Sequence, residues 1–157
     1  MAKAWEVVGL GPDVALGKCA RHILETRFRE MMSYRDGTLR GEDIEQLHSM
    51  RVSSRRLRSA MRNFRDCFDP EGFRYHSDRM REIAATLGAV RDLDVRIDWY
   101  ESLLADSAPA ERPGIRHLIR IARRDRKLAR MPLVTLLARL EEEGYEDRFL
   151  AFIWQES

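Results

Sequence analysis

Two stretches of the sequence concentrate basic side chains that could bind an anion. Residues 48–65 hold one histidine, six arginines and no acidic residue, which gives a formal charge of +6. Residues 112–130 hold seven arginines, one lysine and one aspartate, which gives +7. The whole chain of 157 residues carries only +2, so the remaining residues together carry −11. A guanidinium group offers a planar fork of donors that matches phosphate or carboxylate oxygens, and the preference for arginine over lysine therefore indicates an oxyanion partner.

The spacing of these residues places them on one face of each helix, because a helix turns by about 100° per residue. The first basic ladder consists of His48, Arg51, Arg55, Arg58 and Arg62. The second basic ladder consists of Arg116, Arg120, Arg123, Lys127 and Arg130. The alternative interpretation is an ordinary solvated face, but such a face mixes charges of both signs and these two scarcely do. We therefore interpret the ladders as binding surfaces, and we expect both to face one concave channel that holds a polyanion between them.

The elements that carry the ladders are predicted to be helices. The chain has only five prolines and nine glycines, and its long runs of Leu, Ala, Arg and Glu favour helix. The pattern predicts helices over about 13–33, 42–68, 71–104 and 115–142, with a bend at Gly88 and a kink at Pro132. The connections between them are short, which favours an all-α, antiparallel four-helix bundle. We expect one domain over residues 1–157, with a core at about 13–143 and an apolar tail at 144–157.

The composition also excludes several classes of protein. No segment approaches the roughly 20 apolar residues of a membrane span, and the N-terminus has no secretory apolar region, so a cytoplasmic protein without membrane partners is expected. Cys19 and Cys67 lack C-x-x-C spacing and are expected to be reduced. Asp92 and Asp94 resemble magnesium ligands in type, but two carboxylates without a further cluster are a weak signal, and no metal or cofactor site is predicted.

Two motifs in sequence order resemble a known family. The segment "LHSMRVSSRRLRSAMRNF" is followed after a turn by "LGAVRDLDV". Together they resemble the CHAD domain, the conserved histidine α-helical domain, with its His-x-x-Arg-Val, Arg-Arg-Leu-Arg and Leu-Gly-x-x-Arg-Asp-x-Asp patterns. The resemblance runs from about residue 13 to 143. It implies binding of inorganic polyphosphate, association with polyphosphate granules and no catalysis by the domain itself.

The resemblance also assigns residues to the binding site. His48, Arg51, Arg55, Arg56 and Arg58 take the family's positions on the second helix, and Arg91, Asp92 and Asp94 take those of the Arg-Asp-x-Asp segment. Arg91 either contacts phosphate directly or bridges to carboxylates and orients neighbouring arginines. With the ladders included, the predicted polyphosphate-binding residues are His48, Arg51, Arg55, Arg56, Arg58, Arg62, Arg91, Arg116, Arg120, Arg123, Lys127 and Arg130.

Two other functions fit parts of the same pattern. A histidine phosphotransfer module is a helical bundle with one reactive histidine, and "HSMRVSS" loosely resembles its motif, but Val52 stands where glycine would keep the site open. Nonspecific nucleic-acid binding would use the same arginines. Sequence-specific recognition is not expected, because the ladders lack interleaved aromatics and side chains suited to base readout.

The length of the chain bears on whether it pairs with a second copy of itself. Members of the family commonly hold two related four-helix halves, and this chain has room for about one. The tail carries Tyr145, Phe149, Phe152, Ile153 and Trp154, which predicts an exposed apolar surface and a homodimer formed through it. The alternative is that the tail folds back across its own bundle and leaves a monomer.

Overall fold

The structure, a computed structural model, describes residues 3–155, and within these residues it is all-α, as predicted, with no strand. Its elements are α1 (Leu16–Met32), α2 (Arg35–Arg40), α3 (Ile44–Asn63), a 3₁₀ turn (Arg65–Cys67), α4 (Pro70–Asp106), α5 (Arg112–Glu142) and α6 (Tyr145–Trp154). Residues 1–2 and 156–157 of the predicted domain lie outside the described part of the chain.

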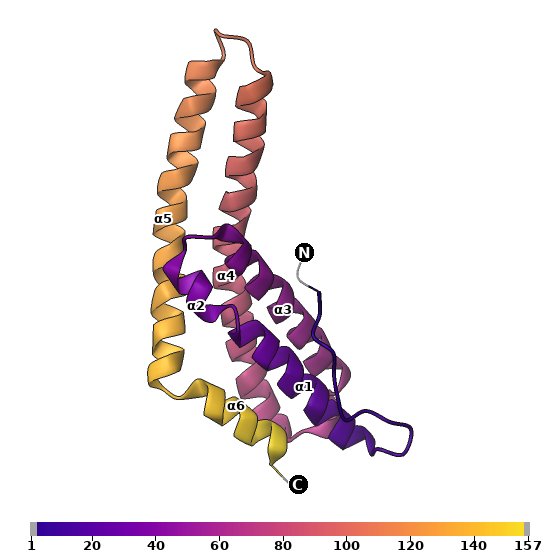
Figure 1. Cartoon of the computed structure of the whole chain (residues 1–157). Helices are drawn as coiled ribbons and strands as arrows, with labels where there is room; N and C mark the ends of the chain where they lie inside the picture. The colour runs from indigo at the N-terminus through magenta and orange to yellow at the C-terminus, as the bar shows by residue number, and fades with distance from the viewer. Residues whose placement is uncertain (1–2, 156–157) are drawn as a thin grey trace.

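The helices are arranged around a long hairpin formed by α4 and α5 (Figure 1). The inner half of this hairpin packs with α3 and α6, α1 packs on α3 and α6, and α2 contacts α3 and α5. The outer half stands clear of the other helices, and there α4 and α5 contact each other alone (Figure 1). α4 lies between α5 and α3 and packs against both.

Local sequence signals explain where the main helices begin. Asp43 caps α3, and its carboxylate accepts a hydrogen bond of 2.9 Å from the backbone N–H of Glu45. Asp69 caps α4 in the same way, accepting from the N–H of Gly72 at 2.7 Å, and Pro70 occupies the first helical position. An N-cap side chain satisfies a backbone donor that the first turn leaves unpaired, and Pro is tolerated at the first position because its missing N–H would have no partner there.

The four expected helices correspond to α1, α3, α4 and α5, but a plain four-helix bundle is not confirmed. The segment predicted as a break contains α2, which ends at Gly41 in a left-handed conformation with a φ of 71°. α4 continues past Gly88 as one helix of 37 residues. Pro132 lies inside α5 without ending it. The apolar tail forms α6.

The expectation that the tail is exposed is wrong except at Trp154, which is 39% exposed, because α6 folds back against the bundle and completes its core. Tyr145, Phe149, Phe152 and Ile153 are buried, and the Phe149 ring stacks on Phe28 of α1 with centroids 4.2 Å apart. The other fully buried large side chains come from α1, α3, α4 and α5 and include Leu24, Met31, Leu47, Met50, Leu57, Met80, Ile83, Leu87 and Leu133. The apolar surface on which the predicted homodimer was based is therefore packed within the chain itself.

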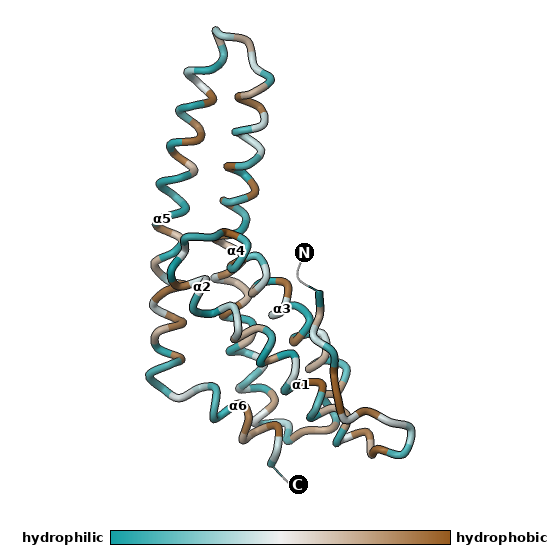
Figure 2. Tube along the Cα trace, in the orientation of Figure 1, coloured by the Kyte–Doolittle hydropathy of each residue, from teal (hydrophilic) through white to brown (hydrophobic). Residues whose placement is uncertain are grey.

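Exposed apolar residues occur instead on the outer half of the hairpin. Trp99 on α4 is 61% exposed, and Val95 and Leu103 lie one turn to either side of it. On α5, Leu118 is also exposed. Figure 2 shows hydrophilic and hydrophobic positions alternating along both helices in this region. Only α4 and α5 cover each other here, so part of each helix's apolar surface remains in contact with water.

A buried histidine ties α6 to α4. His76 shares a hydrogen bond of 2.9 Å between its Nδ1 and the Tyr145 hydroxyl, and the rings of Phe149 and Phe152 surround it. Burial lowers the pKa of His76 to about 4. Burial also raises the pKa of Tyr145. Both groups are therefore neutral at pH 7, as expected for polar groups that are buried without a countercharge.

We predict that His76 makes the fold sensitive to acid. Its pKa is about 6.5 in an unfolded chain and about 4 in the folded one, so between these values the unfolded state binds more protons. The free energy of unfolding should therefore fall as the pH falls from about 6.5 to 4, by about 3 kcal/mol in total from this residue. Urea unfolding at pH 7 and pH 4.5 measures the loss.

Two variants isolate the contribution of the imidazole. His76→Gln should be less stable at pH 7 but should lose less stability on acidification than the wild type. Tyr145→Phe should retain the full pH dependence, because burial rather than the hydrogen bond causes the pKa shift. An equal loss on acidification in His76→Gln and the wild type would contradict the prediction.

Candidate anion-binding grooves

Most of the first basic ladder lines a groove between α3 and α4, which we name the α3–α4 groove. Arg55, Arg58 and Arg62 are exposed, and none of them has a carboxylate within 4.0 Å among the described residues. The groove has a volume of about 320 Å³ and is lined by Arg55, Arg58, Ser59, Met61, Arg62, Arg65, Phe73, Ser77 and Arg81. Five arginines and no carboxylate therefore face one groove.

The pairing of α3 with α4 forms this groove. Arg51 near the start of α3 lies against Gly88, whereas Met61 near its end lies in the groove beside Phe73, so the two helices run antiparallel. This register brings Arg81 of α4 across from Arg58. Sequence reasoning missed Arg81 and Arg65, and only the antiparallel register would have indicated Arg81. Arg81 and Arg65 are each paired with a neighbouring carboxylate, Asp78 at 3.0 Å and Asp66 at 3.3 Å.

The first two members of the ladder lie at the other end of α3, beside the Arg-Asp-x-Asp segment. Arg51 is 4.0 Å from the carboxylate of Asp92, and its side chain is 41% exposed. His48 and Arg91 are half-buried. The Nδ1 atom of His48 and the Nη1 atom of Arg91 are both buried without a hydrogen-bond partner among the described residues. Arg91 forms no ion pair with a carboxylate in this part of the chain, so the structure does not show the bridging role that was one of its two expected roles.

Asp94, in contrast, anchors α4 to α5. It is 3% exposed, and its carboxylate pairs with Arg126 of α5. Its second oxygen is buried without a hydrogen-bond partner among the described residues. A buried carboxylate is costly unless it is paired, so Arg126 is held by Asp94 rather than displayed to solvent.

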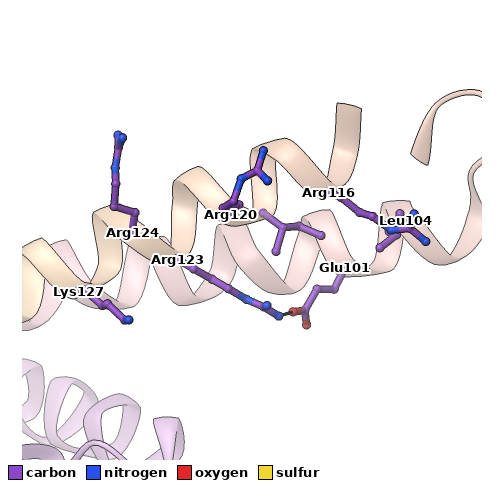
Figure 3. Close-up of a pocket in the computed structure, with 8 residues that line it drawn as sticks. Glu101, Leu104, Arg116, Arg120, Arg123, Arg124 and Lys127 are labelled. Atoms are coloured by element: carbon purple, nitrogen blue, oxygen red, sulfur yellow. Dashed lines mark hydrogen bonds and ion pairs between the residues drawn. The ribbon is translucent and has the colours of Figure 1, made fainter. Parts of the chain in front are cut away.

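The second basic ladder lies on the outer half of the hairpin. Arg116, Arg120, Arg123 and Lys127 are exposed along α5. They line a groove of about 600 Å³, the hairpin groove, together with Glu101, Leu104, Ile119 and Arg124 (Figure 3). Arg123 donates to Glu101 at 2.6 Å, and Arg120 lies 2.7 Å from the Nδ1 of His117. Five cations and one carboxylate therefore face this groove.

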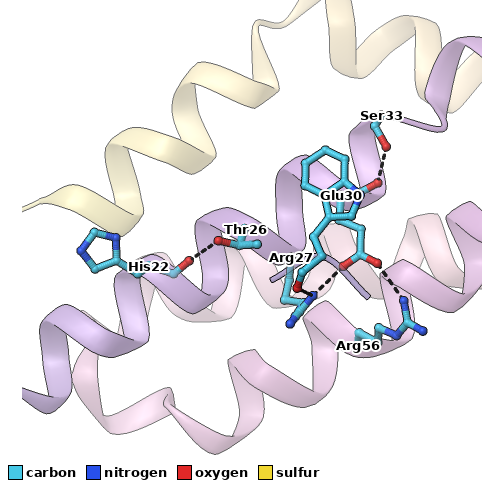
Figure 4. Close-up of polar contacts among 7 residues, drawn as sticks. His22, Thr26, Arg27, Glu30, Ser33 and Arg56 are labelled. Carbon is cyan, nitrogen blue, oxygen red and sulfur yellow. Dashed lines mark hydrogen bonds and ion pairs between the residues drawn. The ribbon is translucent and has the colours of Figure 1, made fainter. Parts of the chain in front are cut away.

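Two of the predicted binding residues are held in partly buried contacts with other helices and line neither groove. Arg56 donates a hydrogen bond of 2.7 Å to Glu30 of α1, a completely buried carboxylate that also accepts from Arg27 at 2.7 Å (Figure 4). Arg56 is turned by about 100° from Arg55 around the helix, which directs it toward α1. It therefore lies outside the α3–α4 groove.

Arg130 is the second such residue. It donates to the backbone carbonyls of Thr38 and Leu39 at 3.2 and 3.0 Å, in the last turn of α2. Burial, followed by the neighbouring charge of Arg126, lowers the pKa of Arg130. Gly41 is required at this point because a Cβ there would come within 2.6 Å of the Arg130 guanidinium and the φ is positive. Arg130 thus fixes α2 on α5, and it does not line the hairpin groove.

The two grooves are separate, and the expected single channel between the ladders is not what the structure shows. No lining residue is common to both. Arg81 lines the α3–α4 groove and Glu101 lines the hairpin groove, and both belong to the continuous helix α4. Arg81 and Glu101 are about 30 Å apart along the axis of α4 and about five and a half turns apart around it. The grooves therefore open on opposite sides of α4.

Comparison with known proteins identifies the family of this helical domain. The model of the CHAD domain matches residues 22–156, which is nearly the whole chain, so the chain belongs to the CHAD domain family. The match includes α6, beyond the predicted core boundary at residue 143. CHAD domains are associated with polyphosphate binding.

Among the relatives are two proteins of Mycobacterium tuberculosis, one from strain CDC 1551 / Oshkosh and one from strain ATCC 25618 / H37Rv, each described only as uncharacterized. Each is 32% identical over 74 residues, which is 47% of this chain and 14% of the relative. This chain thus aligns with a small part of either protein.

Two kinds of feature are absent from residues 3–155. None of the described helices has the length and apolar character needed to cross a membrane. These residues also contain no cluster of three or more His, Cys, Asp or Glu side chains that could hold a metal ion.

We predict that the adjacent residues Arg55 and Arg56 differ sharply in their effect on stability. Arg56→Gln leaves a completely buried carboxylate with Arg27 as its remaining cation, so the loss of stability should be part of the about 3–5 kcal/mol that an uncompensated buried charge costs. Arg55→Gln changes an exposed side chain without a carboxylate partner and should stay within about 0.5 kcal/mol of the wild type. Urea unfolding of the two variants measures the difference. Equal stability of the two variants would contradict the assignment of Arg56 to the Glu30 contact.

Proposed function

We propose that this domain binds inorganic polyphosphate without chemically changing it, with the α3–α4 groove as the principal site. The observation that carries the proposal is the set of five arginines that line this groove without a carboxylate among the lining residues. Arg55, Arg58 and Arg62 repel one another and have no carboxylate partner among the described residues, so an anion in the groove would relieve that repulsion.

The shape of the charge favours a linear polyanion over a single phosphate. The arginines of α3 that line the groove, from Arg55 to Arg62, span about 10 Å along the helix, and Arg65 of the 3₁₀ turn lies beyond them in the same lining. Arg81 faces them from α4, so a chain in the groove would be contacted from both walls. The hydroxyls of Ser59 and Ser77 add neutral donors between the charges. A polymer with an anionic group at each repeat can use all of these contacts at once.

The proposed role includes no catalysis. Guanidinium groups stay protonated at any pH that a protein tolerates, so they can bind and orient phosphate oxygens but cannot act as a base. Through binding alone, the domain would be carried to polyphosphate granules, which is the location we propose for it.

Nonspecific nucleic-acid binding is the main alternative. The same arginines would contact a nucleic-acid backbone, and that binding would also weaken with salt. Phe73 is the aromatic residue in the lining of the α3–α4 groove, and it is half-buried and packs against the core. Proteins that hold single strands stack successive bases on exposed aromatic rings, and neither groove has such a surface in its lining. This observation favours polyphosphate.

Histidine phosphotransfer receives less support. His48 is half-buried and its Nδ1 is enclosed, with Val52 packed one turn later. A phosphotransfer histidine must present a ring nitrogen to an incoming phosphoryl donor; burial removes Nδ1 from that role, which leaves Nε2 as the one candidate nitrogen.

We predict that loss of two groove arginines weakens polyphosphate binding and its salt dependence together. The double variant Arg58→Gln, Arg62→Gln removes two charge-assisted contacts and should lower affinity at least tenfold. The slope of log affinity against log salt concentration should fall by about two, because two fewer counterions are released. Fluorescence anisotropy with labelled polyphosphate at several salt concentrations measures both effects.

The control variant Lys18→Gln, Arg148→Gln removes the same charge from exposed positions on α1 and α6 and should bind like the wild type. Competition with duplex DNA and single-stranded RNA at equal phosphate concentration separates the alternatives. Displacement of polyphosphate by either nucleic acid would favour the nucleic-acid function, and an affinity that does not change with salt would contradict both.

A further inference from the structure

The hairpin groove carries as much uncompensated positive charge as the α3–α4 groove. Arg116, Arg120 and Lys127 have no carboxylate within 4.0 Å among the described residues, which matches the three uncompensated arginines of the first groove. Arg123 and Arg124 add charges that are partly neutralised by Glu101 and Asp125. One domain therefore displays two independent cationic surfaces.

The geometry of α4 prevents a short anion from contacting both surfaces. Arg81 and Glu101, which line the two grooves from α4, are about 30 Å apart along this helix and lie on opposite sides of it. The part of α4 between them carries Asp92, Asp94 and Asp98, along with Arg91 and Arg96. Asp92 is largely exposed. Asp94 and Asp98 line a hollow of about 330 Å³ at the start of α3, which shares Glu101, Arg123 and Lys127 with the hairpin groove. A polyanion that followed α4 from one groove to the other would have to cross a segment of mixed charge, in which Asp92 is exposed and Asp94 is neutralised by Arg126.

We propose that the two grooves hold separate polyphosphate strands, so that a single copy of the domain cross-links polyphosphate. This inference rests on the proposed function and concerns how many strands are bound. A protein with two sites joined by a rigid helix becomes a bridge once both are occupied, and many such bridges turn long chains into a network. The network should form at intermediate ratios of protein to polymer. It should dissolve in excess polymer, because each site then takes a different chain and few bridges remain.

The test compares a short and a long probe on the full chain at fixed low salt. Tripolyphosphate is too short to span the grooves, and calorimetric titration should give two bound per chain for the wild type. Arg58→Gln, Arg62→Gln and the matching variant Arg116→Gln, Arg120→Gln should each reduce this to one. Long-chain polyphosphate should cause light scattering with the wild type and with Lys18→Gln, Arg148→Gln, whereas either single-groove variant should bind it with the scattering lost.

The outcomes separate the failure of this inference from the failure of the proposed function. One tripolyphosphate per wild-type chain would overturn the inference, even if the protein scatters light with long polymer, since a dimer with one site per chain would do the same. Scattering that persists in both single-groove variants would also overturn it. Absence of binding to either probe would refute the proposed function itself. Sedimentation of the ligand-free variants confirms that they remain folded and of unchanged size.

Discussion

The packing of α3 and α5 on the uninterrupted helix α4 determines where both candidate grooves lie. α4 runs without a break from Pro70 to Asp106 and packs against α3 along one side and α5 along another. Each basic ladder is therefore placed relative to α4 rather than relative to the other ladder. Because rotation and rise are fixed along a continuous helix, residues that line the two grooves from α4 are held at a set distance and angle.

Two buried carboxylates allow this strongly basic sequence to fold with part of its positive charge free. Glu30 binds Arg27 and Arg56, and Asp94 binds Arg126. The Arg56–Glu30 pair joins α3 to α1, the Arg126–Asp94 pair joins α5 to α4, and Arg27 pairs with Glu30 within α1. The arginines on the outer faces are left without such partners. A division between structural and displayed arginines thus occurs within single helical turns, as the neighbours Arg55 and Arg56 show.

The sequence allowed prediction of the main helices and of the exposed members of both ladders, because these depend on periodicity and on capping residues within each helix. It did not predict the relation between the ladders, because the angle between α3 and α5 depends on how each packs on α4. Arg81 was not predicted for the same reason, because only the register of α3 on α4 brings it into the α3–α4 groove. Arg56 and Arg130 fit the pattern of charge, but their partners, Glu30 and the carbonyls of α2, are distant in sequence. The tail was apolar as expected, and the aromatic surface of α1 and α4 that buries it could not be recognised from one helix at a time.

The free-standing outer half of the α4–α5 hairpin implies that rigidity is unequal along the domain. In the inner half, the two helices pack with α3 and α6, and opening them requires disruption of the common core. In the outer half, each helix is held by the other alone, and Trp99, Leu103 and Leu118 remain exposed. Backbone amides near the tip therefore exchange their hydrogens through local fraying of two helices, at a lower free energy than those of the inner half, which exchange through global unfolding. The hairpin groove is built on the more mobile half, so occupancy by an anion would slow exchange there far more than in the α3–α4 groove.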